Sequence, residues 1–176
     1  MMRKHFCNLL MGLSLLLASM AGQAQQNTEQ QLKAAYLVNF LKYVEWPENP
    51  AKATICLFGR DVMGAALAGY EGRTVAGREL VLRRVSSPDQ LGECQILYVP
   101  DTEEARFAAV LRWVEGLPIL TVSDAEFFAR QGGGVALVRE ETRLRFDVNI
   151  DALNRAHLKP ASQMMRLARQ VIGGAR

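Results

Sequence analysis

The chain has 176 residues, of which 49% are hydrophobic and 22% are charged, a composition typical of a globular protein and not of a disordered one. Lys and Arg together number 21 against 18 for Asp and Glu. This balance excludes the clustered basic surface that a nucleic-acid-binding protein needs.

The first 24 residues have the layout of a secretory signal peptide. Two basic residues stand among the first four positions, an apolar run covers 9–21, and small residues follow at Gly22 and Ala24. The run is too short for a good transmembrane span, although an uncleaved anchor is the alternative interpretation. We expect cleavage after Ala24, or else after Ala21, and a periplasmic mature protein. Removing the leader leaves 19 basic and 18 acidic residues, a net charge near +1, in a chain of about 150 residues, the size of one ordinary domain.

The mature chain is predicted to begin with an amphipathic helix that ends near Trp46. Thr28 and Gln31 have the spacing of a capping box, and Pro47 disfavours helical geometry in the residue before it. A wide apolar face follows the helical repeat, which indicates a buried helix. Its members are Leu32, Ala35, Tyr36, Leu37, Phe40, Leu41, Tyr43 and Val44.

Short apolar strands then alternate with amphipathic helices. The predicted strands are 54–59, 80–85, 95–100, 118–123, 135–139 and 143–149. The predicted helices are 61–68, 102–115, 123–132, 151–157 and 160–172. This alternation predicts an α/β fold of three layers, with a mostly parallel sheet of about six strands flanked by helices. The strand order 2-1-3-4-5, with strand six antiparallel, agrees with the positions of the cysteines.

Cys56 and Cys94 are the two cysteines that remain after the leader is removed. An even pair in an exported chain is most simply a disulfide. Cys56 lies near the start of the first strand and Cys94 directly precedes the third. The starts of neighbouring parallel strands meet at one edge of a sheet, within the reach of a disulfide.

The sequence predicts no catalytic residues, no metal site and no cofactor. One histidine, His157, remains in the mature chain, and no residues have the spacing of zinc ligands. Four residues at the carboxyl ends of the strands could line a ligand crevice, namely Gly59, Arg60, Ser123 and Asp124. The alternative is that a tight turn and helix capping account for all four.

Seven sequence blocks can now be considered together. They are KAAYLVNFLKYVEWPE (33–48), ICLFG (55–59), VAGREL (75–80), CQILYV (94–99), ILTVSD (119–124), GGGVALV (132–138) and RLRFDVNIDALNRAHLKPASQMMRLA (143–168). In this order and at this spacing the chain resembles the YfiR family of periplasmic proteins. The resemblance implies that residues 25–176 form a single YfiR-like domain.

The resemblance also implies a repressor and not an enzyme. Such proteins bind the periplasmic domain of the inner-membrane diguanylate cyclase YfiN and so control cyclic di-GMP and biofilm formation. The resemblance implies a homodimer, and Cys56 and Cys94 match the family's cysteine pair. A second pair found in some members is missing here. Related domains also act with sensor kinases, so the partner could be the periplasmic domain of a kinase.

Partner contact requires exposed apolar anchors. The candidates are Phe146, Val148, Ile150 and Leu153, in and after the last predicted strand, and core packing is the alternative for all four. The Trp46–Pro47 corner is a second candidate surface. Two other functions stay open at this point: a small-ligand sensor that acts with a sensor kinase, and a hydrolase or redox enzyme.

Overall fold

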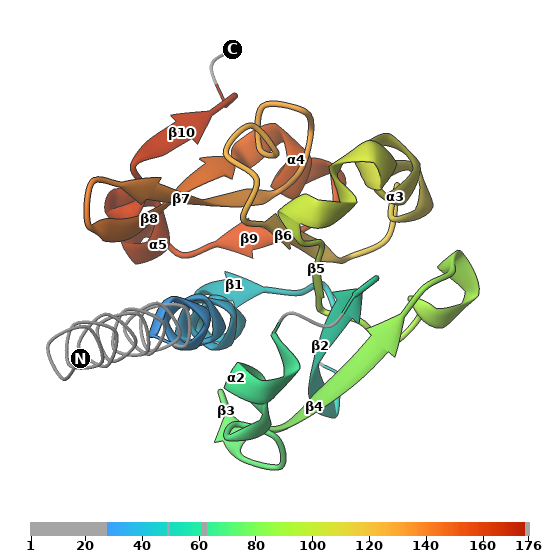
Figure 1. Ribbon diagram of the computed structural model, residues 1–176. Helices are drawn as coiled ribbons and strands as arrows, with labels where there is room; N and C mark the ends of the chain where they lie inside the picture. Colours follow the sequence, from blue (N-terminus) through green and yellow to red (C-terminus); the bar gives the residue numbers. More distant parts are fainter. Residues whose placement is uncertain (1–27, 49, 61–62, 175–176) are drawn as a thin grey trace, which may run out of the picture.

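The computed structural model describes residues 28–48, 50–60 and 63–174 (Figure 1). The predicted leader, residues 1–24, and the first two residues of the predicted helix 61–68 lie outside these ranges. Within them, no helix is both long enough and apolar enough to cross a membrane.

The described part of the first helix covers residues 28–43. The strands are β1 (Val44–Glu45), β2 (Lys52–Phe58), β3 (Thr74–Val75), β4 (Arg78–Val85), β5 (Ile96–Tyr98), β6 (Leu120–Ser123), β7 (Val135–Glu140), β8 (Arg143–Asn149), β9 (Lys159–Pro160) and β10 (Gln170–Ile172). The other α-helices are α2 (Gly64–Ala68), α3 (Phe107–Trp113), α4 (Ile150–Arg155) and α5 (Ser162–Leu167). Two 3₁₀ helices are η1 (Pro88–Gln90) and η2 (Asp101–Arg106).

The main sheet of the described chain has eight strands in the order β10-β8-β7-β6-β5-β2-β4-β3. Strands β4, β2, β5, β6 and β7 are parallel, whereas β8 is antiparallel to β7. The predicted α/β class is therefore confirmed, and the six predicted strands keep their relative order. The predicted strand count was wrong, because β3 adds an antiparallel strand at one edge and β10 a parallel strand beside β8 at the other.

Apolar side chains fill both faces of the sheet. On one face the first helix, α2, α4 and α5 cover the alternate residues of the strands, including Ile55, Leu80 and Phe146. On the other face α3 and the segment before β7 cover Phe58, Leu97 and Val138. Figure 1 shows the first helix (blue) lying beside β1, with the C-terminal elements (orange to red) at the far side of the sheet from β4.

The first helix is buried as predicted, although its buried face is rotated from the predicted one. Leu32 is 45% exposed, whereas Lys33 is only 7% exposed. Lys33 occupies the inner face because its ammonium group forms two ion pairs, with Glu29 at 2.9 Å and with Asp124 at 2.7 Å. A pattern of apolar residues alone cannot reveal a paired charge on an inner face.

The predicted helix over residues 123–132 is wrong, because residues 124–132 form consecutive turns. The Ser123 hydroxyl accepts a hydrogen bond from the Ala125 backbone N–H at 3.1 Å, which closes a local turn and not a helix cap. A helix of so few residues gains little from its own hydrogen bonds. The burial of Phe128, whose ring lies 4.8 Å from that of Phe107, decides the path instead.

The last predicted helix, 160–172, divides into α5 and β10. Between them the guanidinium of Arg169 donates two hydrogen bonds to Asp147, at 2.9 and 2.6 Å, and its backbone N–H donates to the Phe146 carbonyl at 2.7 Å. These bonds align residues 170–172 with β8. Asp147 is 1% exposed, so Arg169 pairs with a carboxylate in the interior of the protein.

The predicted disulfide joins Cys56 to Cys94, and their Cα atoms are 5.7 Å apart. Cys56 lies in β2, opposite Leu97 of β5, and Cys94 lies two residues before β5. Both half-cystines are buried on the face covered by α3. The disulfide thus links two residues that are 38 positions apart in the sequence, and it joins the adjacent parallel strands β2 and β5.

Replacing both half-cystines, Cys56→Ser with Cys94→Ser, should lower the free energy of unfolding by about 4 kcal/mol, the loop-closure term for a loop of this length. Urea unfolding of the oxidised parent and of the variant measures the difference. Reduced parent protein is the control, and it should unfold near the midpoint of the variant. Two titratable thiols in unreduced mature protein would contradict the bond.

Candidate functional site

The four residues of the predicted crevice lie at the carboxyl edge of the sheet in two separate places. Gly59 and Arg60 are exposed after β2, whereas Ser123 is buried at the end of β6 with Asp124 beside it. Strand β5 stands between β2 and β6. The two pairs therefore follow strands that are not neighbours, and their role in a ligand crevice stays a prediction.

Side chains of η2 occupy the carboxyl end of β2. A Cβ atom at Gly59, whose φ is +70°, would overlap the carboxylate of Glu103. Glu103 forms an ion pair with Arg106 at 3.4 Å, and the Arg106 guanidinium lies 4.3 Å from the centre of the Phe58 ring. Gly59 is thus explained by its positive φ and by the close approach of Glu103.

Both carboxylate oxygens of Asp124 accept hydrogen bonds from groups of the protein itself. One carboxylate oxygen accepts from the Lys33 ammonium at 2.7 Å, and the other accepts from the Asp101 backbone N–H at 2.9 Å. The Lys33 and Asp124 side chains are only 8% and 9% exposed. Burial raises the pKa of the nearby Tyr98 phenol, and the negative charge of Asp124 raises it further. This end of the sheet is a buried charge cluster that attaches the first helix to β6.

The partner-binding candidates lie mostly in the core. Phe146, Val148 and Leu153 are 4%, 0% and 1% exposed, and the Phe146 ring packs edge-on against Tyr36 and Phe40 of the first helix. Ile150, at the start of α4, keeps partial exposure. Their role in partner contact stays a prediction. Of the four candidates, only Ile150 has surface that a partner could reach.

The polar groups around α4 also have structural roles. His157 follows the helix with φ of +55°, and Asp151 accepts a hydrogen bond from the Gly174 backbone N–H at 3.1 Å. The helix is capped by Asn149, whose side chain accepts from the Ala152 N–H at 2.9 Å. In the ranges that the structure describes, no group of three His, Cys, Asp or Glu side chains could hold a metal ion.

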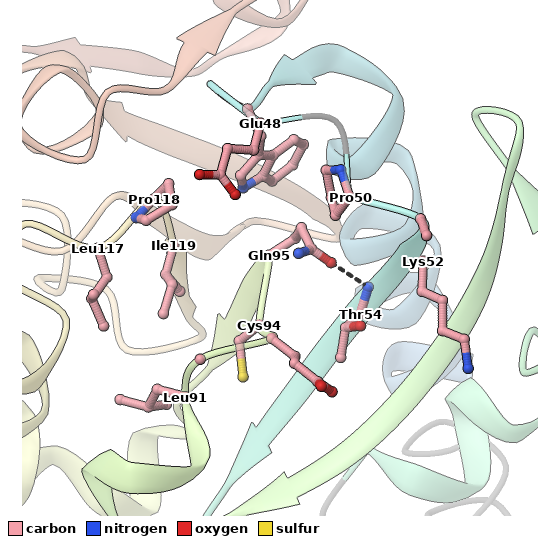
Figure 2. A pocket seen from close by; sticks show the side chains of 14 residues that line it. Glu48, Pro50, Lys52, Thr54, Leu91, Cys94, Gln95, Leu117, Pro118 and Ile119 are labelled. Atoms are coloured by element: carbon pink, nitrogen blue, oxygen red, sulfur yellow. Dashed lines mark hydrogen bonds between the residues drawn. The ribbon is translucent and has the colours of Figure 1, made fainter.

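A pocket of about 420 Å³ lies at the opposite, amino edge of the sheet (Figure 2). Three segments form it: the corner after β1, the loop before β5 and the loop before β6. Its wall includes the side chain of Cys94, so the pocket adjoins the disulfide. The residues that line the pocket include Trp46, Glu48, Lys52, Gln95, Leu117 and Ile119.

Sequence reasoning missed two residues of this pocket. Gln95 was assigned only to a strand, and the Trp46–Pro47 corner was considered only as a contact surface. Trp46 is partly buried against the core, and Arg78 lies 5.9 Å from its ring centre. The strand order could have indicated the site, because it places the starts of β2, β5 and β6 side by side.

A family model described as YfiR/HmsC-like matches residues 30–169. The chain belongs to the YfiR/HmsC-like family. The match covers most of the chain, including the first helix, the disulfide and α5. Membership in the YfiR/HmsC-like family indicates a regulatory protein of the periplasm.

Two solved structures have a similar fold. One is an ABC domain in complex with L-Trp from Streptococcus pneumonia, with a TM-score of 0.56 and 13% identity over 79% of this chain. The other is a conserved domain protein from Vibrio cholerae, with a TM-score of 0.57 and 8% identity over 81% of this chain. The YfiR/HmsC-like chain spans 60% of the length of each. At such identities the likeness describes the fold alone.

Removing the buried charge of Asp124 should destabilise this YfiR/HmsC-like domain. Asp124→Asn leaves the buried Lys33 with only the partly exposed Glu29, so we expect a loss of about 3 kcal/mol in the free energy of unfolding. The control is Glu29→Gln, which removes the more exposed partner of the same ammonium and should cost less than about 1 kcal/mol. Urea unfolding measures both, and equal losses would mean that Asp124 has no special structural role.

Proposed function

We propose that this protein is a periplasmic repressor that holds an inner-membrane diguanylate cyclase of the YfiN type inactive by binding its periplasmic domain. The match to the YfiR/HmsC-like family over residues 30–169 carries this proposal. Release of the cyclase would raise cytoplasmic cyclic di-GMP and favour biofilm formation. The signal-peptide pattern of residues 1–24 and the disulfide between Cys56 and Cys94 are consistent with an oxidising compartment.

A periplasmic domain can act on a cytoplasmic active site only by preferring one conformation of the membrane protein. Its binding changes the ratio of active to inactive cyclase by, at most, the ratio of its affinities for the two conformations. Moving the cyclase from 99% active to 99% inactive requires a difference of about 10⁴-fold. Such a preference needs apolar side chains that are free to contact the cyclase.

We place that contact at the β10 edge of the sheet. Leu167 at the end of α5 is 55% exposed and Val171 in β10 is 44% exposed. Ile150 lies near the same edge, because a Cβ atom at Gly174, two residues beyond β10, would meet its side chain. This edge adds Leu167 and Val171 to Ile150, the candidate from the sequence that keeps accessible surface. Strand β10 is the last strand of the sheet, so its outer side can pair with another chain.

A second candidate function is a small-ligand sensor that acts with a sensor kinase, and the pocket beside Cys94 favours it. Capture of the membrane partner from cells and its identification by mass spectrometry distinguishes a kinase from a cyclase. The proposal also includes a homodimer, which sedimentation of the purified mature protein measures.

Charges on the β10 edge should abolish repression without unfolding the protein. In a strain that lacks this gene, parent protein should lower cyclic di-GMP, whereas Leu167→Glu with Val171→Glu should leave it severalfold higher. The control is Leu32→Glu, which alters an apolar residue that is 45% exposed on the first helix. Thermal unfolding of each purified variant checks that folding is kept.

A strain whose cyclic di-GMP does not respond to deletion of this gene would contradict the repressor function. Full repression by the Leu167→Glu, Val171→Glu variant would contradict only the location of the contact.

A further inference from the structure

The wall of the pocket at the amino edge of the sheet contains an N–H donor, the side-chain amide of Gln95, that has no partner among the described residues. Gln95 is 8% exposed, and its side-chain oxygen accepts from the Thr54 backbone N–H at 2.6 Å. Because a backbone N–H can only donate, the oxygen must face Thr54 and the amide nitrogen must face away.

Figure 2 shows the Gln95 nitrogen on the side of the pocket where Ile119 lies. The Gln95 backbone is held firmly, because its N–H donates to the Thr54 carbonyl at 3.0 Å and its carbonyl accepts from the Leu120 N–H at 2.8 Å. A donor fixed in a cavity wall and left unpaired is a binding group, since a ligand oxygen that reaches it recovers a hydrogen bond.

The other walls of the pocket indicate the size and polarity of the part of the ligand that carries no hydrogen-bonding group. Leu91, Leu117, Pro118 and Ile119 give an apolar lining on one side, and the Trp46 corner with Pro50 gives another. A volume of about 420 Å³ lies at the lower end of the range for small-molecule pockets. Apolar walls beside an indole suit a small ring system.

The charges at the mouth favour a neutral ligand. Glu48 and Lys52 are both exposed there and have opposite signs. The other acidic side chain, Glu93, forms an ion pair with Arg83 at 2.5 Å. The mouth thus carries no excess of either sign that would attract a cation or an anion.

We propose that this pocket binds a small, uncharged aromatic molecule whose carbonyl oxygen accepts a hydrogen bond from Gln95 Nε2 and whose ring lies against the apolar walls. The site lies at the edge of the sheet opposite the predicted crevice at Ser123 and Asp124. It does not depend on which membrane protein is the partner, because none of its residues belongs to the β10 edge.

The test is a titration of the oxidised mature protein with benzamide, followed by ¹H–¹⁵N NMR. The indole N–H signal of Trp46, assigned with Trp113→Phe, and the Gln95 amide signals should shift in a saturable manner. Toluene has a similar ring without the carbonyl, and it should bind at least tenfold more weakly. Absence of saturable shifts with benzamide, or equal binding of toluene, would overturn the proposal.

Gln95→Glu is the decisive variant. It keeps an oxygen for the Thr54 N–H, and it replaces the donor that faces the pocket with an acceptor. We expect benzamide affinity to fall by roughly tenfold, the factor for one lost hydrogen bond. Gln90→Glu is the matched control, because the Gln90 side-chain oxygen likewise accepts from a backbone N–H, that of Ser86 at 2.7 Å, outside the pocket.

The Gln90→Glu variant should bind benzamide as the parent does. A Gln95→Glu variant that folds and keeps the parental affinity would overturn the role of Gln95 as donor. Should Gln95→Glu fail to fold, Leu117→Trp supplies the second variant, because an indole at this wall fills the cavity and should abolish the shifts.

Discussion

The packing of the first helix across one face of the sheet is the constraint on which most of this structure depends. Its buried residues Leu37, Phe40 and Leu41 belong to the core on that face, and the Tyr36 hydroxyl donates to the Leu144 carbonyl at 2.9 Å. Lys33 attaches the helix to Asp124, and at the other end the Ala161 N–H donates to the Tyr43 carbonyl at 2.7 Å. Strand β8 therefore has its inner face covered by this helix, and its neighbour β10 forms the edge of the sheet on that side.

The main features of the fold could be predicted because they follow from local patterns with strong periods. Apolar runs gave the six central strands, and the even pair of cysteines indicated which strands are neighbours. The two edge strands could not be found in this way. Residues 170–172 have no alternating pattern, and they become a strand only because Arg169 reaches the buried Asp147 across 22 positions of sequence. A long-range ion pair leaves no periodic signal in the chain.

The functional residues were harder to predict than the fold, because the sequence does not record which polar groups find partners. Ser123 and Asp124 were reasonable candidates, yet both are occupied by hydrogen bonds within the protein. Gln95 looked unremarkable, and the structure leaves one of its donors free in a cavity wall. The apolar residues of β8 have the same ambiguity, since an alternating strand predicts one buried face without saying whether a helix or another protein covers it.

The position of β10 near the end of the chain affects where a tag can be attached to this protein. Because β10 ends at Ile172, an affinity tag fused after Arg176 would begin only a few residues after the strand. A tag at the other end would have to follow the predicted cleavage position. The β7–β8 hairpin tip at Glu141 and Thr142 is exposed on every residue from 139 to 143. Insertion of an epitope there would label the protein while leaving both ends of the chain in their natural form.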